Sequence, residues 1–423
     1  MKKRRKTGNK TARAATAIAL MATTLCVAGC KSGKTEKTVL TVWCSQLDTA
    51  LAKSIAEEFN AERGGIYEFR FAAQGENEIA TKILTDVEAA PDVFSFPGDS
   101  IVKLIAGDAL ARVGGERLTR LKESNDEEAT DAASVTLADG STATYAFPYT
   151  DNTFFLYYNK SRFSPSDVQS LDGILGKCSK RQRFAMPLND GWYTTAFYFG
   201  ADLGYDVTYN DNFAETQITT NFGNETGKKV TRAIYEVVSD GRVLPDADDS
   251  AIAAGFADGS VIAATSGIWN KTTVQSYLGD DFAVAKLPTY TFARGESDEA
   301  QKQLTAFAGY KMMGVGQYSK AKAAAFDFAE FYTNKESQIK RFKARGFVPT
   351  NKEARKEQIV LGDPCARAIA EQLRFSKVQK NVPSTLWTPM QGLGNAMIAA
   401  ASSGSAFKID TELAACVKAI EKR

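Results

Sequence analysis

Three strand patterns separated by two helix patterns, between residues 38 and 97, restrict the fold of this chain more than any other feature. The strand patterns are short, apolar and rich in β-branched and aromatic residues. They read TVLTVWC (38–44), YEFRFAA (67–73) and PDVFSF (91–96). Alternating strands and helices of this kind predict a parallel α/β sheet with helices packed on its faces.

Two amphipathic helices are predicted between these strands. The first follows Asp48, a predicted N-cap, and its apolar face at four-residue spacing is formed by Leu51, Ile55 and Phe59. The second reads NEIATKILTDVEA (77–89). Ligands of open α/β sheets bind beyond the carboxyl ends of the strands. We therefore expect the loops 43–48 and 96–100 to lie at one binding rim.

The N-terminus has the features of a bacterial lipoprotein signal. A basic start, MKKRRK, precedes an apolar stretch, AATAIALMATTLCV, and small residues lead to Cys30 in VAGC. This pattern predicts that residues 1–29 are removed, that Cys30 is lipidated, and that residues 30–37 form a polar tether. The alternative is an ordinary secretory signal with a chance cysteine. Either signal places the protein outside the cytoplasm.

Removal of this signal reverses the sign of the net charge. The whole chain has 52 basic and 50 acidic residues. Seven of the basic residues and none of the acidic residues lie in residues 1–29, which leaves 45 against 50, a net charge of −5. A weakly acidic chain carries no nucleic-acid footprint. Nearly 400 residues exceed one typical core, so two lobes are expected.

The chain contains no histidine, which excludes Ser-His and Cys-His triads and histidine zinc sites. No cofactor or metal site is expected. A carboxylate pair, as in glycoside hydrolysis, is the catalytic chemistry that remains open. Four cysteines follow Cys30, and their wide spacing leaves both free thiols and disulfides open. They are Cys44, Cys178, Cys365 and Cys416.

Several motifs in one order resemble the bacterial extracellular sugar-binding proteins of ABC importers, the class that contains maltose-binding protein. They are PDVFSF, FPYTDNTFFLYYNKSRF, FADGSVIAATSGIWNK, AFDFAEFYTNKESQ and VPSTLWTPM. The resemblance covers nearly the whole chain after the signal. It implies a two-lobed, hinge-connected α/β fold of the type II periplasmic-binding-protein class, with a ligand cleft between the lobes.

The same resemblance implies where the lobes begin and end. The N-lobe would hold 38–150 and 308–347, and the C-lobe would hold 153–305 and 352–423. The chain would cross between the lobes near Asp151 and Asn152, near residues 308–310, and in GFVPTNK (346–352).

The resemblance also implies which aromatic residues meet the ligand. Trp192, Trp269 and Trp387 match cleft positions of the family, and core packing is the alternative for each. Phe96 and Trp43 match aromatic positions at the cleft edge. Gly191, before Trp192, leaves room for a ligand at the backbone or serves a tight turn.

Five polar residues complete the expected site. Asp190 lies two residues before Trp192, Asn152 matches a ligand-contacting carboxylate position, and Asp99 matches an acidic one. Gln46 and Asp48 belong to the loop after Trp43. This loop lacks the lysine of maltose-binding protein, and Ser100 replaces an arginine, so maltose itself is not implied.

These features predict a monomeric, lipid-anchored receptor that is not an enzyme. It would capture a sugar or oligosaccharide and deliver it to the permease subunits of an ABC importer in the cell membrane. One alternative keeps the receptor but changes the ligand to a polyamine or another small solute. Another is a lipoprotein glycoside hydrolase that uses two carboxylates, with Asp190 and Asp99 as the first suspects.

Overall fold

The computed structural model describes residues 36–421. The predicted signal peptide, Cys30 and most of the predicted tether lie outside these described residues.

A six-stranded sheet contains all three strands predicted near the N-terminus. β1 pairs in parallel with β2 on one side and with β3 on the other, which confirms the predicted parallel unit. β16 runs antiparallel to β3 and also pairs with β6 and β17. The strands are β1 (Thr38–Ser45), β2 (Tyr67–Gln74), β3 (Val93–Pro97), β6 (Ala146–Asn152), β16 (Ala306–Val315) and β17 (Ser376–Val378).

Helices cover both faces of this sheet, so side chains from alternate strand positions enter two different cores. Along β1, Leu40 and Val42 enter one core, and in β3 Phe94 and Phe96 enter the other. The helices are α1 (Thr49–Glu62), α2 (Ile79–Thr85), α3 (Ile101–Ala106), α4 (Gly115–Ser124), α5 (Glu127–Ala132), α11 (Lys322–Tyr332) and α12 (Lys335–Arg345). The second predicted helix is shorter than its pattern at both ends, because Glu76–Glu78 form a 3-10 turn before α2 and α2 ends at Thr85.

A five-stranded sheet forms the second half of the fold, in the order β11-β8-β12-β7-β13. Along β7, Phe154, Leu156 and Tyr158 enter one core, whereas Phe155 and Tyr157 enter the other. The adjacent tyrosines Tyr157 and Tyr158 thus point to opposite faces and pack in different cores. The strands are β7 (Phe154–Asn159), β8 (Arg183–Ala185), β11 (Val243–Leu244), β12 (Val261–Gly267) and β13 (Phe282–Ala285).

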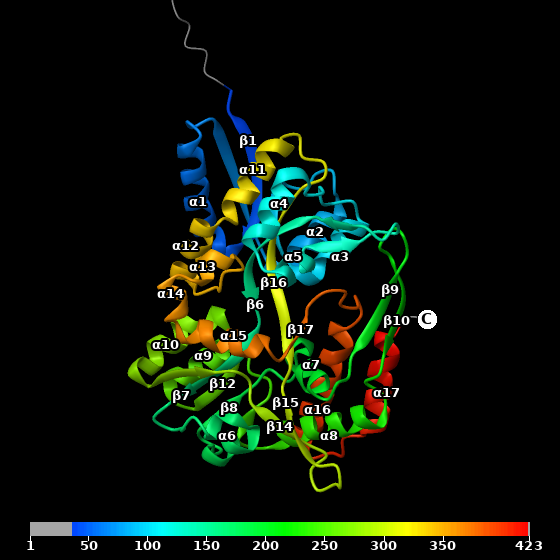
Figure 1. Ribbon diagram of the computed structural model, residues 1–423. Helices are drawn as coiled ribbons and strands as arrows, with labels where there is room; N and C mark the ends of the chain where they lie inside the picture. Colours follow the sequence, from blue (N-terminus) through cyan, green and yellow to red (C-terminus); the bar gives the residue numbers. More distant parts are fainter. Residues whose placement is uncertain (1–35, 422–423) are drawn as a thin grey trace, which may run out of the picture. The chain divides into compact units, whose positions relative to one another are not determined.

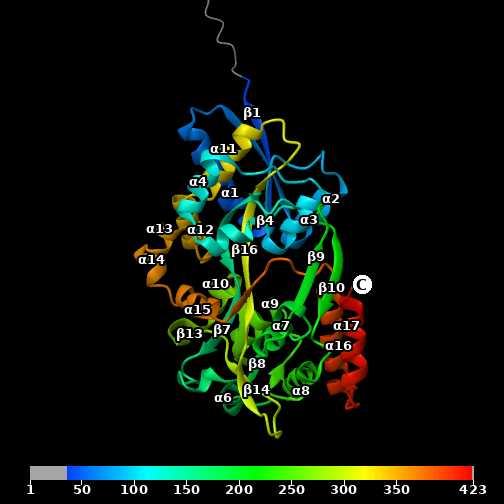
Figure 2. The same ribbon diagram turned by 45° about the vertical axis from the view of Figure 1, so that its right-hand side comes forward.

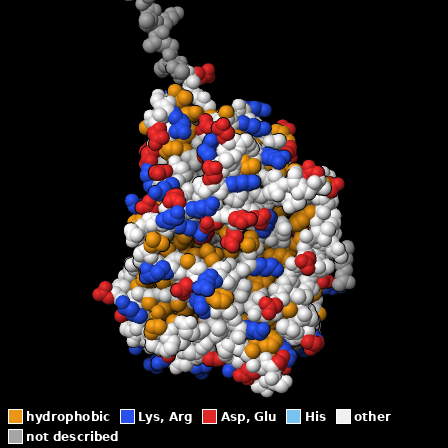
Figure 3. Space-filling view, viewed as in Figure 1, with side chains coloured by type: hydrophobic (Ala, Val, Ile, Leu, Met, Phe, Trp, Pro, Cys, Tyr) orange, Lys and Arg blue, Asp and Glu red, His pale blue; other side chains and the backbone are white. Residues whose placement is uncertain are grey.

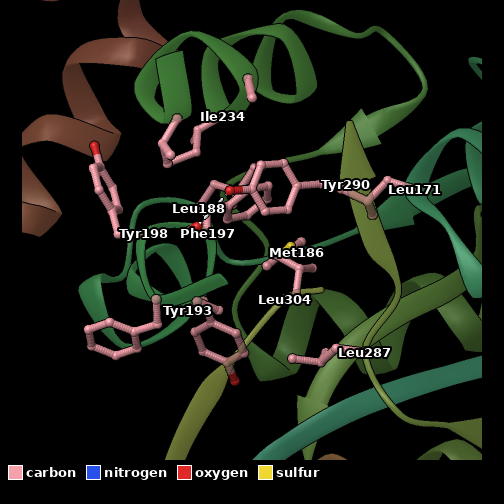
Figure 4. Close-up of a cluster of buried hydrophobic side chains, with 14 of the residues drawn as sticks. Leu171, Met186, Leu188, Tyr193, Phe197, Tyr198, Ile234, Leu287, Tyr290 and Leu304 are labelled. Atoms are coloured by element: carbon pink, nitrogen blue, oxygen red, sulfur yellow. Dashed lines mark hydrogen bonds between the residues drawn. The ribbon is translucent and has the colours of Figure 1, made fainter. Parts of the chain in front are cut away.

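Helix α7 (Gly191–Gly200) is the centre of the larger of these two cores. Its sequence, GWYTTAFYFG, is apolar on nearly all sides, as expected for a buried helix. Figure 4 shows Tyr193, Phe197 and Tyr198 of this helix among side chains from neighbouring elements, and the hydroxyl of Tyr290 donates a hydrogen bond of 2.7 Å to the carbonyl of Phe197. Trp192 is the residue of this first turn that remains partly exposed.

Further helices pack around the second sheet, and three two-stranded hairpins complete the fold. The helices are α6 (Leu171–Lys177), α8 (Glu225–Ser239), α9 (Asp249–Asp258), α10 (Lys271–Leu278), α13 (Lys352–Arg355), α14 (Gln358–Leu361), α15 (Pro364–Leu373), α16 (Trp387–Ser403) and α17 (Ile409–Ile420). The hairpins are β4 (Ser134–Thr136) with β5 (Thr142–Thr144), β9 (Tyr205–Tyr209) with β10 (Glu215–Thr220), and β14 (Thr289–Phe292) with β15 (Ala300–Gln303).

Strand β16 joins the two halves. Its first residues, Ala306 and Phe307, lie in the core around α7, and its last residues, Met313 and Val315, lie in a core of the first sheet. Figures 1 and 2 show this long strand, in yellow, running between the two sets of elements.

The three segments predicted to cross between the lobes are hydrogen-bonded to one another. Gly309 pairs with Asn152, and the amide of Asp151 donates to the carbonyl of Val348 at 3.0 Å. The lobe boundaries themselves stay predictions. The chain returns once more to the first sheet in β17, within the segment 352–423 that was expected in the C-lobe.

Among the described residues, no helix combines the length and the apolar character that a membrane crossing needs. The cysteines Cys44, Cys178, Cys365 and Cys416 are free and buried. Burial raises the pKa of three of these thiols to about 12, so they behave as apolar core residues at neutral pH. Those three are Cys178, Cys365 and Cys416.

Candidate ligand-binding site

A cavity of about 770 Å³ lies between elements of the two sheets. On one side it is lined by residues at the carboxyl ends of β1 and β3, among them Ser45, Leu47 and Asp99, where the rule for open sheets places a ligand. On the other side it is lined by the first turns of helices around the second sheet. Figure 3 shows the face of the molecule that is turned to the viewer in Figure 1. A hollow at mid-height of this face contains apolar side chains beside acidic and basic ones.

Six of the ten predicted ligand-binding residues line this cavity. All three expected cleft tryptophans are among them, together with two acids and one amide. They are Trp192, Trp269, Trp387, Asp190, Asp99 and Asn152. Residues more than 230 positions apart in the sequence thus share one cavity.

The other four predicted residues do not line the cavity. Phe96 is fully buried in the core, because its position in β3 directs its side chain toward the helices that pack on that face of the sheet. Its ring centroid lies 5.8 Å from that of Phe94. Trp43 lies within β1 and packs against the same core. Gln46 is exposed outside the lining.

Asp48 is buried and bonded within the protein. It precedes α1, but its carboxylate makes no capping bond to that helix. Instead it accepts a hydrogen bond of 3.1 Å from the guanidinium of Arg345, a residue whose own side chain lines the cavity. Asp48 therefore contacts a residue of the lining without lining the cavity itself.

Trp192 and Trp269 form one aromatic wall. Their ring centroids are 5.9 Å apart and their planes meet at 41°. The indole N–H of Trp192 donates to Oε1 of Gln379 at 3.0 Å, and the indole N–H of Trp269 donates to Oδ2 of Asp249 at 2.8 Å. With both donors bonded to protein, these side chains offer a ligand their ring surfaces.

Trp387 stands at the start of α16 and packs edge-on against Phe307, with centroids 5.5 Å apart. The same helix explains Gly191. A Cβ at this position would lie 2.8 Å from Cβ of Met390, so the glycine allows close packing of α7 on α16. Neither of the two roles expected for Gly191, a tight turn or room for a ligand, accounts for this contact.

Acidic side chains outnumber basic ones in the lining by six to three. The acids are Glu76, Asp99, Asp190, Asp246, Asp248 and Asp249, and the bases are Lys103, Lys311 and Arg345. Burial removes water from two of these carboxyls, and this desolvation raises the pKa of both Asp99 and Asp190. Among the described residues no group of acids or cysteines is placed to hold a metal ion.

Sequence reasoning missed several lining residues. Lys311 is buried in the apolar strand β16, where its ammonium lies 2.8 Å from Oε2 of Glu76 and 4.3 Å from the ring centre of Phe347. A lysine inside an otherwise apolar strand pattern was the available signal, because a buried charge needs a partner. The acids at 246, 248 and 249 stand together in the sequence as DADDS, but only the fold brings them into one lining with the tryptophans.

The buried side-chain oxygen of Asn152 has no hydrogen-bond partner among the described residues. Fold and site together define a two-lobed binding protein with an aromatic, acceptor-rich cavity.

Comparison with known proteins gives the family. Residues 54–365 match the bacterial extracellular solute-binding proteins, and the chain belongs to this family. It is 25% identical to the galactooligosaccharide-binding protein of Bacillus subtilis (strain 168) over 316 aligned residues. The aligned region covers 71% of this chain and 70% of that protein.

Solved structures of similar fold cover nearly the whole chain. One solved with acarbose has 28% identity and a TM-score of 0.75, over 91% of this chain and 98% of the other. The maltodextrin-binding protein of L. casei BL23, without ligand, has 22% identity and a TM-score of 0.74, over 91% and 99%. The Thermus thermophilus maltotriose-binding protein, bound with maltotriose, has 20% identity and a TM-score of 0.73, over 90% and 98%. These likenesses confirm the predicted two-lobed fold.

Proposed function

We propose that this protein is a receptor that binds a neutral oligosaccharide in the cavity. The observation that carries the proposal is the union of three tryptophans with a fringe of acceptors in one cavity. A pyranose presents C–H groups on its faces and hydroxyls at its edge. Rigid aromatic rings match the faces at small entropic cost, and carboxylates and amides match the edge.

The charge of the lining favours an uncharged ligand rich in hydroxyl donors. Glu76 is paired with Lys311, and Asp249 is bonded to Trp269, whereas Asp99 and Asp190 keep acceptor capacity toward the cavity. An anionic sugar would meet the excess of carboxylates and lose affinity. Relatives support the same class, since their names or ligands are a galactooligosaccharide, maltotriose and acarbose.

Affinity of the expected size is physically reasonable. A micromolar dissociation constant corresponds to about −8 kcal/mol. Two or three stacked rings and several charged hydrogen bonds, each contributing about 1.5 to 3 kcal/mol, reach this value after ordering costs.

Delivery to a membrane permease completes the proposed role. Lipid on Cys30, after loss of residues 1–29, would hold the protein at the outer surface of the cell membrane by the tether 30–37. A ligand that contacts both lobes binds the closed state more tightly and shifts the population toward it. The closed receptor would then dock on the permease of an ABC importer, and it performs no chemistry on the sugar.

Isothermal calorimetry with a saccharide panel tests the proposal. The panel contains galactooligosaccharides, maltooligosaccharides, acarbose, and an oligosaccharide of uronic acids matched in length. We expect micromolar binding of at least one neutral oligosaccharide and at least about tenfold weaker binding of the uronate, since tenfold is about 1.4 kcal/mol. Absence of binding by every sugar, or hydrolysis of a bound glycoside, would contradict the proposal.

A polyamine is the second candidate ligand, and the six carboxylates of the lining favour it. Aromatic rings and acids together form a cage for ammonium groups. Spermidine in the same calorimeter separates the two candidates. Tight spermidine binding that weakens steeply with salt, without sugar binding, would replace the oligosaccharide by the polyamine.

A further inference from the structure

The indole of Trp269 lies in a seat made by two residues that the sequence did not mark as functional. Gly267 is under the ring: a Cβ at that position would lie 2.0 Å from Cζ3 and 2.1 Å from Cη2 of Trp269. Asp249 holds the N–H edge of the ring at 2.8 Å. Trp192 lies beside it. The orientation of the ring thus depends on an empty Cβ position and on one carboxylate.

Both oxygens of Asp249 accept hydrogen bonds from the turn that carries Trp269. Oδ2 accepts from the indole N–H of Trp269, whereas Oδ1 accepts from the hydroxyl of Ser266 at 3.0 Å and from the side-chain amide of Asn270 at 2.9 Å. The neighbouring Asp248, not Asp249, caps α9, because its carboxylate accepts from the amide of Ala251 at 2.7 Å. The carboxylate of Asp249 therefore does not cap α9, and its hydrogen bonds all go to the turn 266–270.

We propose that Asp249 and Gly267 are positioning residues that fix the ring plane of Trp269 as a ligand platform. The inference rests on the proposed function, and it adds that the platform requires a carboxylate at 249 and a glycine at 267. Asp249 positions the ring through its N–H and leaves the ring surface to the sugar.

Asparagine cannot replace Asp249 in this network, although it has the same shape. An asparagine side chain has one accepting oxygen and one donating nitrogen. If its nitrogen faces Trp269, two N–H groups oppose each other. If its nitrogen faces Asn270, the amide of Asn270 must turn to offer its oxygen, and the bond to the indole N–H of Trp269 is then accepted by a neutral oxygen instead of a charged one. Asparagine therefore weakens the contacts that hold the ring in either orientation.

The first experiment observes the ring without any ligand. The chain has four tryptophans, so 5-fluorotryptophan labelling gives four ¹⁹F signals, and the variants Trp269→Phe and Trp43→Phe assign the signals of these two residues. We expect Asp249→Asn to shift or broaden that signal and to leave the signal of Trp43 in place. Asp246→Asn is the matched control: it removes the same charge from the same cavity, and Asp246 makes no hydrogen bond to an indole among the described residues. Gly267→Ala should displace the same signal, because the added Cβ overlaps the ring.

The second experiment measures affinity for the neutral oligosaccharide that binds the wild type most tightly. We expect Asp249→Asn to weaken binding about tenfold relative to Asp246→Asn, the effect of about 1.4 kcal/mol. Circular dichroism checks that both variants fold. If Asp249→Asn matches Asp246→Asn in both the ¹⁹F signal of Trp269 and the affinity, the positioning role is wrong. If no sugar binds the wild type, the proposed function fails, and the ¹⁹F result alone decides whether Asp249 holds the ring.

Discussion

At the scale of single residues, Trp192 shows that core packing and ligand contact are not exclusive roles. Its ring packs against Phe154 with centroids 4.9 Å apart and against Tyr193 at 5.2 Å, while the same side chain lines the cavity. Its N–H is bonded to Gln379. A side chain held on several sides is a rigid surface, which loses little entropy when a ligand stacks on it.

Replacement of Trp192 by alanine should therefore reduce affinity and stability together. We expect at least about tenfold weaker sugar binding, and a loss of about 2 to 4 kcal/mol of unfolding free energy from the truncated aromatic side chain. Trp43→Ala is the matched control, because Trp43 packs against a core but lies outside the cavity lining. It should lose stability and keep affinity. Equal affinity losses in both variants would show that unfolding, not ligand contact, explains the effect.

A second residue, Asp151, combines deep burial with an ion pair at the predicted crossing between lobes. Both of its carboxylate oxygens accept from the guanidinium of Arg355, at 2.8 and 2.7 Å, and Arg355 also pairs with Asp126 at 2.5 Å. Burial raises the pKa of Asp151 from 3.8 to about 6, although Arg355 opposes the rise. The folded protein therefore binds this proton more tightly than the unfolded chain does.

Stability should consequently contain a component that is lost as the pH rises. For a carboxyl with a raised pKa, the stabilisation is complete below the unfolded value and disappears as the pH passes the folded value. We expect the free energy of unfolding of the wild type to fall, relative to Asp151→Asn, by on the order of 2 kcal/mol between about pH 4 and about pH 7. Urea unfolding at several pH values measures it. Parallel pH curves for the two proteins would contradict the prediction.

At the scale of elements, the first turns of α7 and α16 each present a tryptophan to the cavity. Trp192 and Trp387 lie at these helix starts, and the two helices meet at Gly191. Asp190 caps α7 by accepting from the amide of Trp192 at 2.8 Å, so the cap also fixes the backbone of a platform residue. The distance between Trp192 and Trp387 therefore depends on how closely α7 packs against α16.

The variant Gly191→Ala tests this coupling. Its Cβ would overlap Met390, so α7 and α16 must move apart, and overpacking of this kind costs about 1 to 3 kcal/mol. We expect lower stability and weaker sugar binding. Gly392→Ala, in α16 itself, is the control: a Cβ there meets nothing within 4 Å, and alanine should raise stability by about 0.5 to 1 kcal/mol. Thermal melts measure the stability of both variants, and calorimetry measures their affinity for the sugar. Unchanged affinity in Gly191→Ala would contradict the coupling.

At the scale of the whole molecule, β16 connects the two halves mechanically. It supplies Phe307 to the core around α7 and Met313 to a core of the first sheet. Its pairing with β6 brings Gly309 opposite Asn152, whose side chain lines the cavity. A strand shared by both cores opposes independent unfolding of either half.

Thermal unfolding should accordingly be one cooperative transition, and the ligand should stabilise the entire molecule. At a free sugar concentration of about 100 times the dissociation constant, linkage predicts about 2.7 kcal/mol of added stability. Differential scanning calorimetry with and without sugar measures both. Two resolved transitions, with only one of them moved by the sugar, would show that the halves unfold separately.

The sequence alone determined features that depend on local pattern or on composition. The spacing of apolar residues after Asp48 and the three strand patterns predicted β1, α1, β2 and β3, because periodicity is a local property of the chain. The absence of histidine excluded whole classes of catalysis. A resemblance in motif order predicted Trp192, Trp269 and Trp387 as site residues, and the structure brings all three to one cavity.

Only the tertiary structure decided which side of an element faces the cavity and which distant charges meet. Phe96 and Trp43 occur in the expected strands, but both faces of that sheet are covered, so alternation could not tell core from cleft. The hydrogen bonds from Arg345 to Asp48 and from Trp269 to Asp249 join different elements of the structure, and no local sequence pattern encodes them. The physical reason is that burial and hydrogen-bond pairing are set by packing between elements, whereas strand and helix patterns are set within them.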